Sequence, residues 1–397
     1  MTLLKSKPQV KRHLVKLITI ALGLNAIVIC GWVYNAFKPP ALFHKDFIQF
    51  YLMAKAEASG QPIYTPLVDL ALEFDTNLGD YHQHPAAYPP TVLYFIVPLA
   101  KFSYIGALIV WDSIEVLCFA LATILIWREL RSRTAVDWLA LVTVSCVVWP
   151  PFYYDLYHGQ VMMMILLLLT GTWLAIKSGR HRMGGICLGL LFALKLYAWP
   201  ILLFLVWRRK YRSVFWAIGL FILLNAIIAM WLGTGIFSQY LEVAQQISLI
   251  YRTHPSNFSP FAIGTELVGT WFGVSLGVLA LIIAFALAAR APDFDHAFMI
   301  MTAVSIITSP VAWGHYLITL MPAFCLITSW KSVQCQEKVL MAILVCFTLP
   351  EIYRPFLSEV IVRLIPLLFV FGVMLLLGRL LRHESRFLYK WKRSAQH

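Results

Sequence analysis

Long hydrophobic runs separated by short polar intervals dominate the 397-residue sequence. A helix of about 20 apolar residues crosses the hydrocarbon core of a bilayer, and most of these runs approach that length. They predict spans at about 14–34, 105–127, 136–152, 161–177, 213–232, 263–289, 297–310, 316–330, 339–353 and 360–378. The pattern therefore predicts an all-α polytopic membrane protein with about 12 transmembrane helices.

Two further hydrophobic segments do not fit one full span each. The segment 88–99 is short and is followed by Lys101, so we expect it to be interfacial or re-entrant. The segment 183–207 has basic clusters at both ends and Lys195 in its middle. Because both ends belong on one side of the membrane, the segment predicts two short helices with Lys195 at the turn between them.

The longest polar interval contains the segment that we read as catalytic. The polar intervals are 35–88, 233–262 and a basic tail, 379–397, within a single predicted domain, 1–397. The run from Phe43 to Pro66 begins with Asp46 and continues as an alanine-rich helix-forming stretch that stops at Gly60. We expect an amphipathic helix on the membrane surface that holds one carboxylate against the bilayer.

Composition and charge agree with this class of protein. Hydrophobic residues make up 60% of the sequence and charged residues 13%, whereas soluble domains have about 45–50% apolar and about 25% charged residues. The net charge of +13 is spread in small clusters between hydrophobic runs, which argues against a nucleic-acid partner. The seven cysteines lie almost entirely in apolar segments, so they indicate neither a disulfide framework nor a metal site.

The distribution of basic residues predicts the orientation. About 24 of the 32 Lys and Arg residues fall on the side that the positive-inside rule assigns to the cytoplasm. Both termini are then cytoplasmic, and the intervals 35–88 and 233–262 face outward. The run 14–34 is longer than a signal-peptide core, so we expect it to be retained as the first helix of a multi-pass cell-membrane protein.

Polar side chains of the kinds used in catalysis gather on the predicted outer side. They are Asp46, Asp155, His158, Gln160, His254, Asn257, Trp313 and His315, and Lys195 points the same way. Polar groups near the membrane core are a functional-site hypothesis by default. Outside the cell there is no nucleoside triphosphate, so a reaction there needs a substrate that carries its own activation across the membrane. A sugar linked to a lipid phosphate is such a substrate.

That chemistry needs few protein groups. Phosphate is already a good leaving group, so one carboxylate acting as base on the acceptor hydroxyl is sufficient, and Asp46 is the candidate. Lys195, His315 and Arg252 are candidates for stabilising the developing phosphate charge. We expect sugar or acceptor contacts from Tyr51, Tyr64, Gln160, His254, Asn257 and Trp313. His82 and His84 near Asp80 are a weak metal signal, so we predict no metal ion and no cofactor.

Several of these residues also occur in an order that resembles a known family. They are Asp46-Phe47 with Tyr51, Gly60 with Ile63-Tyr64, Tyr88-Pro89-Pro90 with Pro98-Leu99, His158-Gly159-Gln160, Gly184 to Gly189 with Lys195, and Ser309-Pro310 with Trp313 and His315. The chain resembles glycosyltransferase family 87, the polyprenyl-phosphate-mannose-dependent α-1,2-mannosyltransferase group of the GT-C superfamily. The resemblance implies a GT-C-type bundle, an outer-face active site with Asp46 as base, a polyprenyl-phosphate sugar donor and a lipid or cell-envelope glycan acceptor. It leaves the acceptor open, and some members transfer arabinose.

Simpler interpretations of the same residues remain open at this stage. Asp46 is placed where a helix N-cap would be. Lys195 could extend its ammonium to the membrane interface without binding a ligand. His315 could be a residue at the end of a span whose ring is hydrogen-bonded to a backbone carbonyl. Asp112 and Glu115 have the position of acids at an outer helix N-terminus. The alternative functions are a secondary transporter, for which no inverted repeat is visible, and a non-catalytic scaffold of an envelope complex.

Overall fold

The computed structural model describes residues 45–76, 84–131, 150–252, 254–291, 293–329 and 357–394, with six isolated positions before residue 45. All the regular elements in these ranges are α- or 3-10 helices, so the predicted all-α class is confirmed. Most of the predicted spans 14–34 and 136–152, and all of 339–353, lie outside the described residues. The number of about 12 spans therefore stays a prediction.

Four described helices are long and apolar enough to cross a membrane. They are α5 (Tyr104–Leu130), α11 (Tyr211–Leu232), α14 (Thr270–Ala289) and residues 361–378 of α19 (Glu359–Ser394). All four coincide with predicted spans, although predicted span 263–289 also includes part of a second helix. They expose large apolar side chains such as Phe215, Trp271 and Leu368 at the surface of the protein. This is the surface that lipid covers in a membrane protein.

Shorter apolar helices fill the space between these spans. They are α8 (Met162–Lys177), α9 (His181–Leu194), α10 (Trp199–Trp207), α15 (Phe294–Ile307) and the pair η4 (Gly314–Leu320) and α16 (Met321–Ser329). The predicted break at Lys195 is confirmed, because α9 ends at Leu194 and a 3-10 turn, η3 (Leu196–Ala198), leads into α10. Lys195 itself is extended, with φ −162°.

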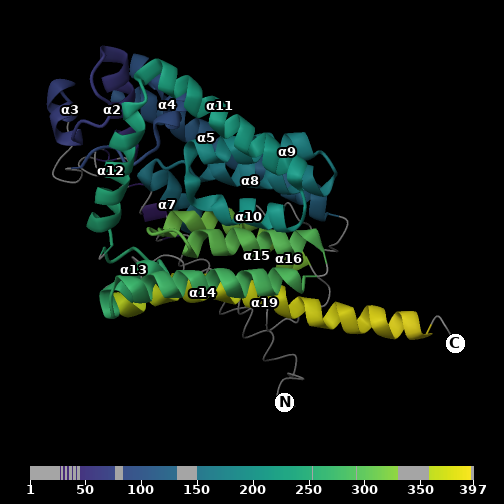
Figure 1. Cartoon of the computed structure of the whole chain (residues 1–397). Helices are drawn as coiled ribbons and strands as arrows, with labels where there is room; N and C mark the ends of the chain where they lie inside the picture. The colour runs from purple at the N-terminus through teal and green to yellow at the C-terminus, as the bar shows by residue number, and fades with distance from the viewer. Residues whose placement is uncertain are drawn as a thin grey trace.

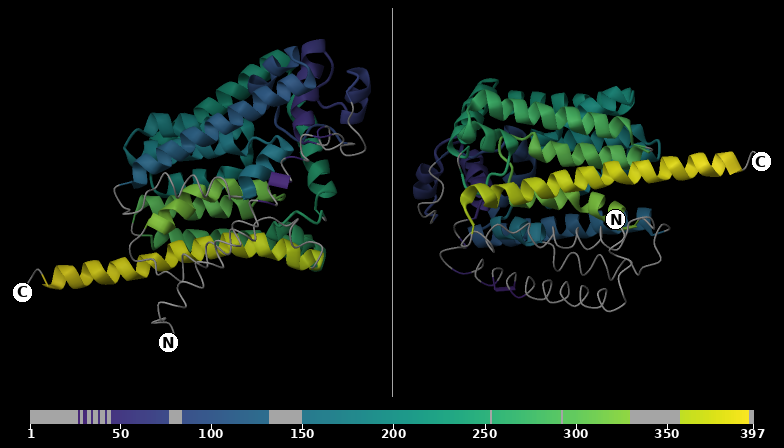
Figure 2. Two further views of the ribbon diagram at one scale, coloured as in Figure 1. Left: turned by 180° about the vertical axis from the view of Figure 1, so that it is seen from behind. Right: turned by 90° about the horizontal axis from the view of Figure 1, so that it is seen from below.

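The helices form three adjacent groups (Figures 1 and 2). The first group contains α5, α8, α9 and α11, the second α10, α15 and α16, and the third α13 (Pro260–Leu267), α14 and α19. Short elements gather at one end of the bundle: α2 (Phe47–Ser59), α3 (Leu67–Glu73), α4 (Leu93–Ile96), α7 (Pro150–His158) and α12 (Gly235–Ile250). The C-terminal helix α19 extends beyond the opposite end.

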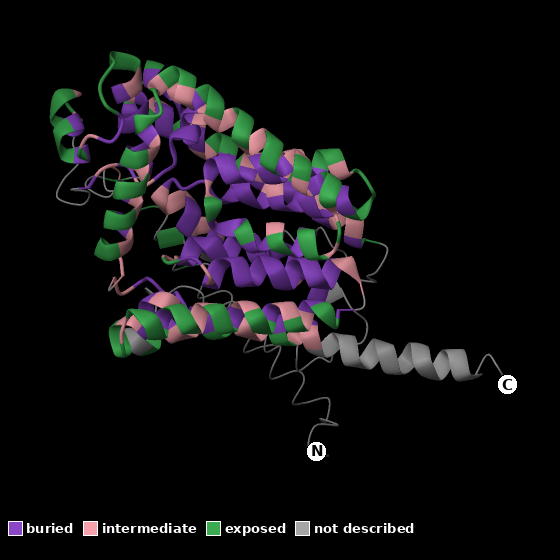
Figure 3. Ribbon diagram, in the orientation of Figure 1, coloured by how far each residue is buried: buried purple, intermediate pink, exposed green. Residues whose placement is uncertain are grey.

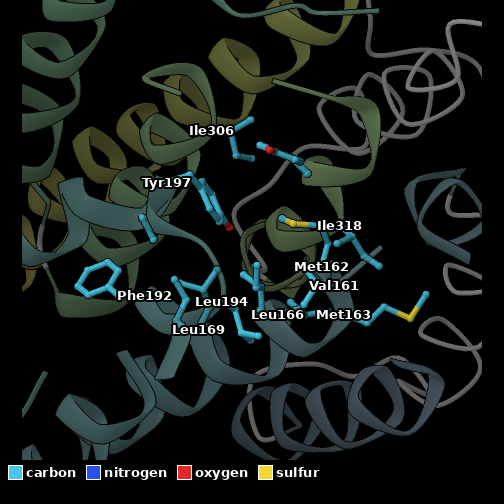
Figure 4. Close-up of a cluster of buried hydrophobic side chains, with 14 of the residues drawn as sticks. Val161, Met162, Met163, Leu166, Leu169, Phe192, Leu194, Tyr197, Ile306 and Ile318 are labelled. Atoms are coloured by element: carbon cyan, nitrogen blue, oxygen red, sulfur yellow. The ribbon is translucent and has the colours of Figure 1, made fainter. Parts of the chain in front are cut away.

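The centre of the bundle is built around α8 and α15 (Figure 3). Residues 295–307 of α15 are all buried, whereas α11 buries only Ser213, Ala217 and Ile228. Figure 4 shows Met162, Leu166 and other apolar side chains of α8 packed with neighbours from α9, α15 and η4. Lipid tails are as apolar as these side chains, so close packing rather than exclusion of water holds such a core together. This core forms a rigid support for the polar residues at its end.

Close helix contact through glycine positions Lys195. Gly185 and Gly189 lie four residues apart on the face of α9 that meets α11. A Cβ atom at Gly185 would lie 2.4 Å from the carbonyl oxygen of Ser213, and one at Gly189 would lie 2.9 Å from that of Ala217. Small residues at this spacing let two membrane helices approach closely. The end of α9, and with it Lys195, is thereby fixed against the bundle.

The prediction of a surface amphipathic helix after Asp46 is wrong. Helix α2 spans Phe47–Ser59 and ends at Gly60, as predicted, but nine of its thirteen residues are buried. Phe50 lies against Tyr88 and Trp111, with ring centroids 4.2 and 5.0 Å apart. The helix is therefore inserted between other elements of the protein, with Asp46 at its N-terminal end.

Two further boundaries differ from the prediction. The run 263–289 is not one helix, because the chain turns at Gly269 and α13 packs back on α14. Gly269 has a φ of 139°, a backbone conformation that residues other than glycine rarely adopt. The interval 233–262 includes a 16-residue helix, α12. The segment 88–99 forms η1 (Pro90–Val92), α4 and η2 (Val97–Lys101), so it is not a single spanning helix, in agreement with the prediction.

Candidate active site

Asp46 is joined to Gln160 from a distant part of the chain. The Gln160 side-chain amide donates a hydrogen bond from Nε2 to Asp46 Oδ2 over 2.6 Å. Asp46 occupies the N-cap position of α2, as the simpler interpretation expects, but its side chain makes no capping hydrogen bond to the helix. The carboxylate is one-fifth exposed. It is therefore held in a defined direction while remaining open to a reacting group.

Gln160 is itself fixed from several sides. The Tyr88 hydroxyl donates to Gln160 Oε1 over 2.8 Å, and the Trp111 indole donates to the Gln160 carbonyl oxygen over 3.0 Å. The preceding residue, Gly159, has φ +61°, and a Cβ there would lie 2.6 Å from the Cβ of Phe47. Only glycine accommodates both that conformation and that contact. The turn after α7 thus directs the Gln160 amide at Asp46.

Two histidines and a tyrosine adjoin the carboxylate. His158 Nδ1 lies 3.7 Å from Asp46 Oδ2, and the ring centroids of His158 and His315 are 6.2 Å apart. Tyr154 stacks on His315 at 5.7 Å. His315 is 2% exposed, and within the described residues neither of its ring nitrogens has a hydrogen-bond partner. A buried imidazole without partners loses its hydration, which is typical of a residue that binds a ligand.

Lys195 approaches the same place from the break between α9 and α10. Its ammonium lies 4.3 Å from the ring centroid of Tyr316 and 5.6 Å from that of Tyr88. The carboxylates that act on its charge are those of Asp46 and Asp155. The structure thus brings together Asp46, Gln160, Lys195 and His315, four of the residues that the sequence predicted for the site.

Lys45 holds the helix that carries His158. Its side chain is fully buried, and its ammonium donates to the carbonyl oxygens of Tyr157 and Leu156 over 2.8 and 3.4 Å. A positive charge at the C-terminal carbonyls of α7 is favourable because the helix dipole is negative there. Burial lowers the pKa of Lys45 to about 8, and the Asp112 carboxylate opposes that decrease.

Buried carboxylates fix the start of α8, directly after Gln160. Glu115 Oε2 accepts hydrogen bonds from the backbone N–H groups of Met163 and Met164, and Asp155 Oδ1 accepts one from Met162. The prediction that Glu115 supplies charge to the N-terminus of its own helix is therefore wrong. Glu115 lies well inside α5 and caps a neighbouring helix, whose first N–H groups have no partner within that helix.

A second polar cluster lies beside this site and is connected to it by the chain. Trp313 contacts His254 and Tyr251, with ring centroids 5.0 and 5.5 Å apart, and the Tyr251 hydroxyl is 2.7 Å from His84 Nε2. Trp313 is two residues before His315. The cluster therefore extends the candidate site toward α12 and η1.

Asn257 joins the two loops of this cluster. Its amide nitrogen donates to the carbonyl oxygens of Tyr251 and Pro310, and its amide oxygen accepts from the N–H groups of Ser259 and Ala312. All four bonds are made to the backbone, so the side chain acts here as a clamp between loops. This geometry gives Asn257 a structural role in the loops, and its sugar contact stays a prediction.

Three predicted site residues are directed elsewhere. The Tyr51 hydroxyl donates to the Phe102 carbonyl oxygen over 3.2 Å, and the Tyr64 hydroxyl to that of Tyr88 over 2.8 Å. Tyr64 thus supports the Tyr88 backbone without reaching Asp46. For Arg252, no hydrogen bond or ion pair to the Asp46 group occurs among the described residues.

The weak metal signal around His84 is accounted for by other contacts. His84 bonds to Tyr251 and to the Pro85 carbonyl oxygen, while His82 and Asp80 lie outside the described residues. In the part of the chain that the structure describes, no group of three or more His, Cys, Asp or Glu side chains has a metal-binding arrangement.

Sequence reasoning missed Tyr88, Tyr154 and Lys45 as parts of the site. The motif Tyr88-Pro89-Pro90 carries part of the family resemblance without assigning Tyr88 a role, and no sequence motif singles out Tyr154 or Lys45. The available signals were local: Tyr88 precedes two prolines, and Lys45 is adjacent to Asp46. Neither signal identifies the contacting partner, which lies more than 70 positions away in both cases.

Comparison with known proteins identifies the family of the chain. The family model of glycosyltransferase family 87 matches residues 86–312, more than half of the chain, including Gln160 and Lys195. The polyprenol-phosphate-mannose-dependent α-(1-2)-phosphatidylinositol mannoside mannosyltransferase of Mycobacterium tuberculosis is 25% identical over 328 residues, covering 77% of this chain and 75% of the relative. No solved structure gives a significant match. With an apolar helical bundle and a matching family model, the chain is a member of glycosyltransferase family 87, a membrane glycosyltransferase.

Proposed function

We propose that this membrane glycosyltransferase transfers a hexose, with mannose as the first candidate, from a polyprenyl-phosphate donor to a hydroxyl of a lipid or cell-envelope glycan. The mycobacterial relative, a polyprenol-phosphate-mannose-dependent mannosyltransferase, supports the choice of donor and sugar. The observation that carries the proposal is a single oriented carboxylate, Asp46, beside the ammonium of Lys195. This combination fits a reaction that needs one base and one cation.

Asp46 is the base in the proposed reaction. The acceptor hydroxyl gives its proton to the Asp46 carboxylate while its oxygen attacks the anomeric carbon of the sugar. The bond from that carbon to the phosphate oxygen breaks, and the lipid phosphate leaves with the electron pair. No second carboxylate is needed as a general acid, in contrast to hydrolysis of an ordinary glycoside. A single displacement of this kind inverts the configuration at the anomeric carbon.

Lys195 stabilises the leaving phosphate in this proposal. The phosphate gains negative charge as the sugar departs, so a cation beside it favours the transition state more than the ground state. The half-buried position of Lys195 among tyrosine rings strengthens such an interaction because little water screens it. The unpartnered ring nitrogens of His315 are a further candidate contact for the phosphate.

The cluster of His254 and Trp313 is the proposed acceptor side. An aromatic ring beside polar side chains suits the face of a sugar ring, and Trp313 meets His254 at close to a right angle. Gln160 contributes by orienting Asp46, and Asn257 by holding the loops together. We assign Tyr51 and Tyr64 supporting positions only, and we keep Arg252 as a more distant candidate for the donor phosphate.

We also propose that the site faces the outside of the cell membrane and that both termini are cytoplasmic. The asymmetric distribution of Lys and Arg supports this orientation. The donor, the acceptor and membrane lipids are then the partners of the protein, and no nucleic acid, metal ion or cofactor takes part.

Transfer of a labelled sugar tests this function. Purified protein in lipid vesicles is incubated with a cell-envelope lipid extract and either labelled polyprenyl-phosphate mannose, polyprenyl-phosphate arabinose or a nucleotide-linked mannose. We expect label to reach the extract from the polyprenyl-phosphate mannose. Transfer from the arabinose donor alone would contradict the assignment of mannose as the transferred sugar. Transfer from the nucleotide-linked mannose alone would contradict the proposed class of donor.

A further inference from the structure

A cavity lies at the end of the bundle opposite Asp46. Its volume is about 440 Å³, and its basic lining residues are Arg180, His181, Arg182 and Arg212. Helix α8 begins two residues after Gln160 and runs for 16 residues to Lys177, which at 1.5 Å per residue is about 24 Å. The turn from α8 to α9 therefore lies far from the candidate active site, toward the opposite end of the bundle (Figure 1).

The cavity has a positively charged lining, and the described part of the chain does not neutralise that charge. Within the described ranges, no ion pair joins Arg180, Arg182 or Arg212 to a carboxylate. Lys177, only three residues before Arg180, is by contrast paired with Glu129 and Asp295 at 2.6 and 2.5 Å. The structure thus satisfies a neighbouring cation while leaving the arginines available to an external anion.

The basic groups converge from two turns of the chain. Arg180 and Arg182 come from the α8–α9 turn, and Arg212 comes from the start of α11. Lys210 and Arg212 are close enough to act electrostatically on His181, whose Nδ1 lies 3.2 Å from the Ser213 hydroxyl. Guanidinium groups bind phosphate well because their planar N–H donors match two phosphate oxygens at once. The arrangement is therefore suited to an anionic oxygen group such as a phosphate.

Apolar surface adjoins the arginines. Met183 and Ile186 line the same cavity, and Met183 is 56% exposed. Tyr211 and Phe215, beside Arg212 at the start of α11, are 59% and 71% exposed. A free phosphate ion makes no apolar contacts with such a surface, whereas the acyl chains of a phospholipid would cover it. Basic pockets between membrane helices are a known form of lipid headgroup site.

We propose that this cavity binds the phosphate headgroup of an anionic glycerophospholipid, with the acyl chains along the exposed face of α9 and α11. The predicted orientation puts the site in the inner leaflet. It is separate from the candidate active site, and a lipid bound there stabilises the α8–α9 turn and the start of α11. Since α8 begins and α9 ends at the candidate active site, the lipid supports the frame that holds Gln160 and Lys195.

Lipid binding to the full-length protein in detergent tests the site. Native mass spectrometry measures the affinity for phosphatidylglycerol and for phosphatidylcholine, with inorganic phosphate added in a separate titration. The variant is the double substitution Arg180→Gln and Arg212→Gln, which leaves the stacking of Arg182 on Trp216 intact. Its matched control is Arg128→Gln with Arg131→Gln, which removes the same charge from exposed residues at the end of α5 outside the cavity.

We expect the parent to prefer phosphatidylglycerol by about tenfold or more, and the cavity variant to lose about tenfold or more of that affinity. The control variant and the affinity for phosphatidylcholine should change by less than about threefold. Equal losses in both double variants, or no loss in the cavity variant, would overturn the site. Displacement of the lipid by millimolar inorganic phosphate would overturn the lipid assignment. If the double variant does not fold, the single substitution Arg212→Gln gives the same comparison.

Discussion

Gln160 donates a 2.6 Å hydrogen bond to Asp46 across 114 positions of the sequence. This bond joins the residue before α2 to the turn between α7 and α8, so the candidate base depends on the packing of three helices. Tyr88 and Trp111 hold Gln160 in turn. The carboxylate is thus directed by the fold and does not rely on the conformation of its own loop.

Replacing Gln160 by Glu should lower transfer and change its pH dependence. A second carboxylate beside Asp46 raises the proton affinity of the pair, because two like charges at close range disfavour ionisation. We expect turnover at neutral pH to fall by about tenfold or more, with the acid side of the pH–activity profile moved to higher pH. Gln245→Glu, at an exposed position of α12, is the control. An unchanged profile with an intact fold would show that Gln160 does not orient the base.

Lys195 variants test the stabilisation of the leaving phosphate. Lys195→Gln should lower turnover by about 100-fold, because the site loses the charge that opposes the developing phosphate charge. Lys195→Arg should keep part of the activity, since it keeps the charge. Lys101→Gln, at the exposed end of η2, is the matched control. If Lys195→Gln binds donor and turns over like the parent, the phosphate site has to be sought around His315 and Arg252.

The buried ammonium of Lys45 predicts a pH-dependent stability. Burial lowers the pKa of Lys45 from 10.5 to about 8 in the folded protein. Between these values the unfolded chain holds a proton that the folded chain releases, so stability rises as the pH increases from about 8 to about 10.5. The difference in melting temperature between the parent and Lys45→Met should therefore shift in favour of the parent over this interval. Lys55→Met is the control, and a pH-independent difference for Lys45→Met would contradict the assignment.

The proposed orientation can be tested with reporter fusions. A reporter after Asn77, in the interval 35–88, should be found outside the cell, and one after Ser394, at the end of α19, in the cytoplasm. The expectation follows from the excess of basic residues on one side of the predicted spans. Reporters on the same side would contradict the topology, and with it the assignment of the arginine cavity to the inner leaflet.

Much of the helical framework could be predicted from the sequence. The break at Lys195 was predictable because a cation in the middle of a run with basic ends cannot belong to one spanning helix. The burial of α2 was not, because alanine-rich sequence fits both a membrane surface and a crowded core. The turn at Gly269 also escaped prediction, since glycine is common within membrane helices and only packing of α13 on α14 reveals the break.

The candidate site was predictable in its residue types more than in its contacts. Asp46, Gln160, Lys195 and His315 were expected together because they lie at the same side of the predicted topology. The Tyr88 contact to Gln160 was missed, since a tyrosine near a membrane end is usually an interface residue. Asn257 illustrates the converse, because a polar side chain on the correct side can be used entirely by backbone groups. Topology identifies a side of the membrane, whereas only packing identifies partners.

Sugar transfer by Asp46→Asn tests the central claim most directly. The substitution keeps the size of the side chain and an oxygen that can accept from Gln160, but it removes the base. With labelled polyprenyl-phosphate mannose, and with rates corrected for inserted protein, we predict a loss of about 100-fold to 10,000-fold. Asp69→Asn makes the same chemical change at an exposed position of α3 and should match the parent. An Asp46→Asn protein that transfers mannose at the parental rate would contradict the account.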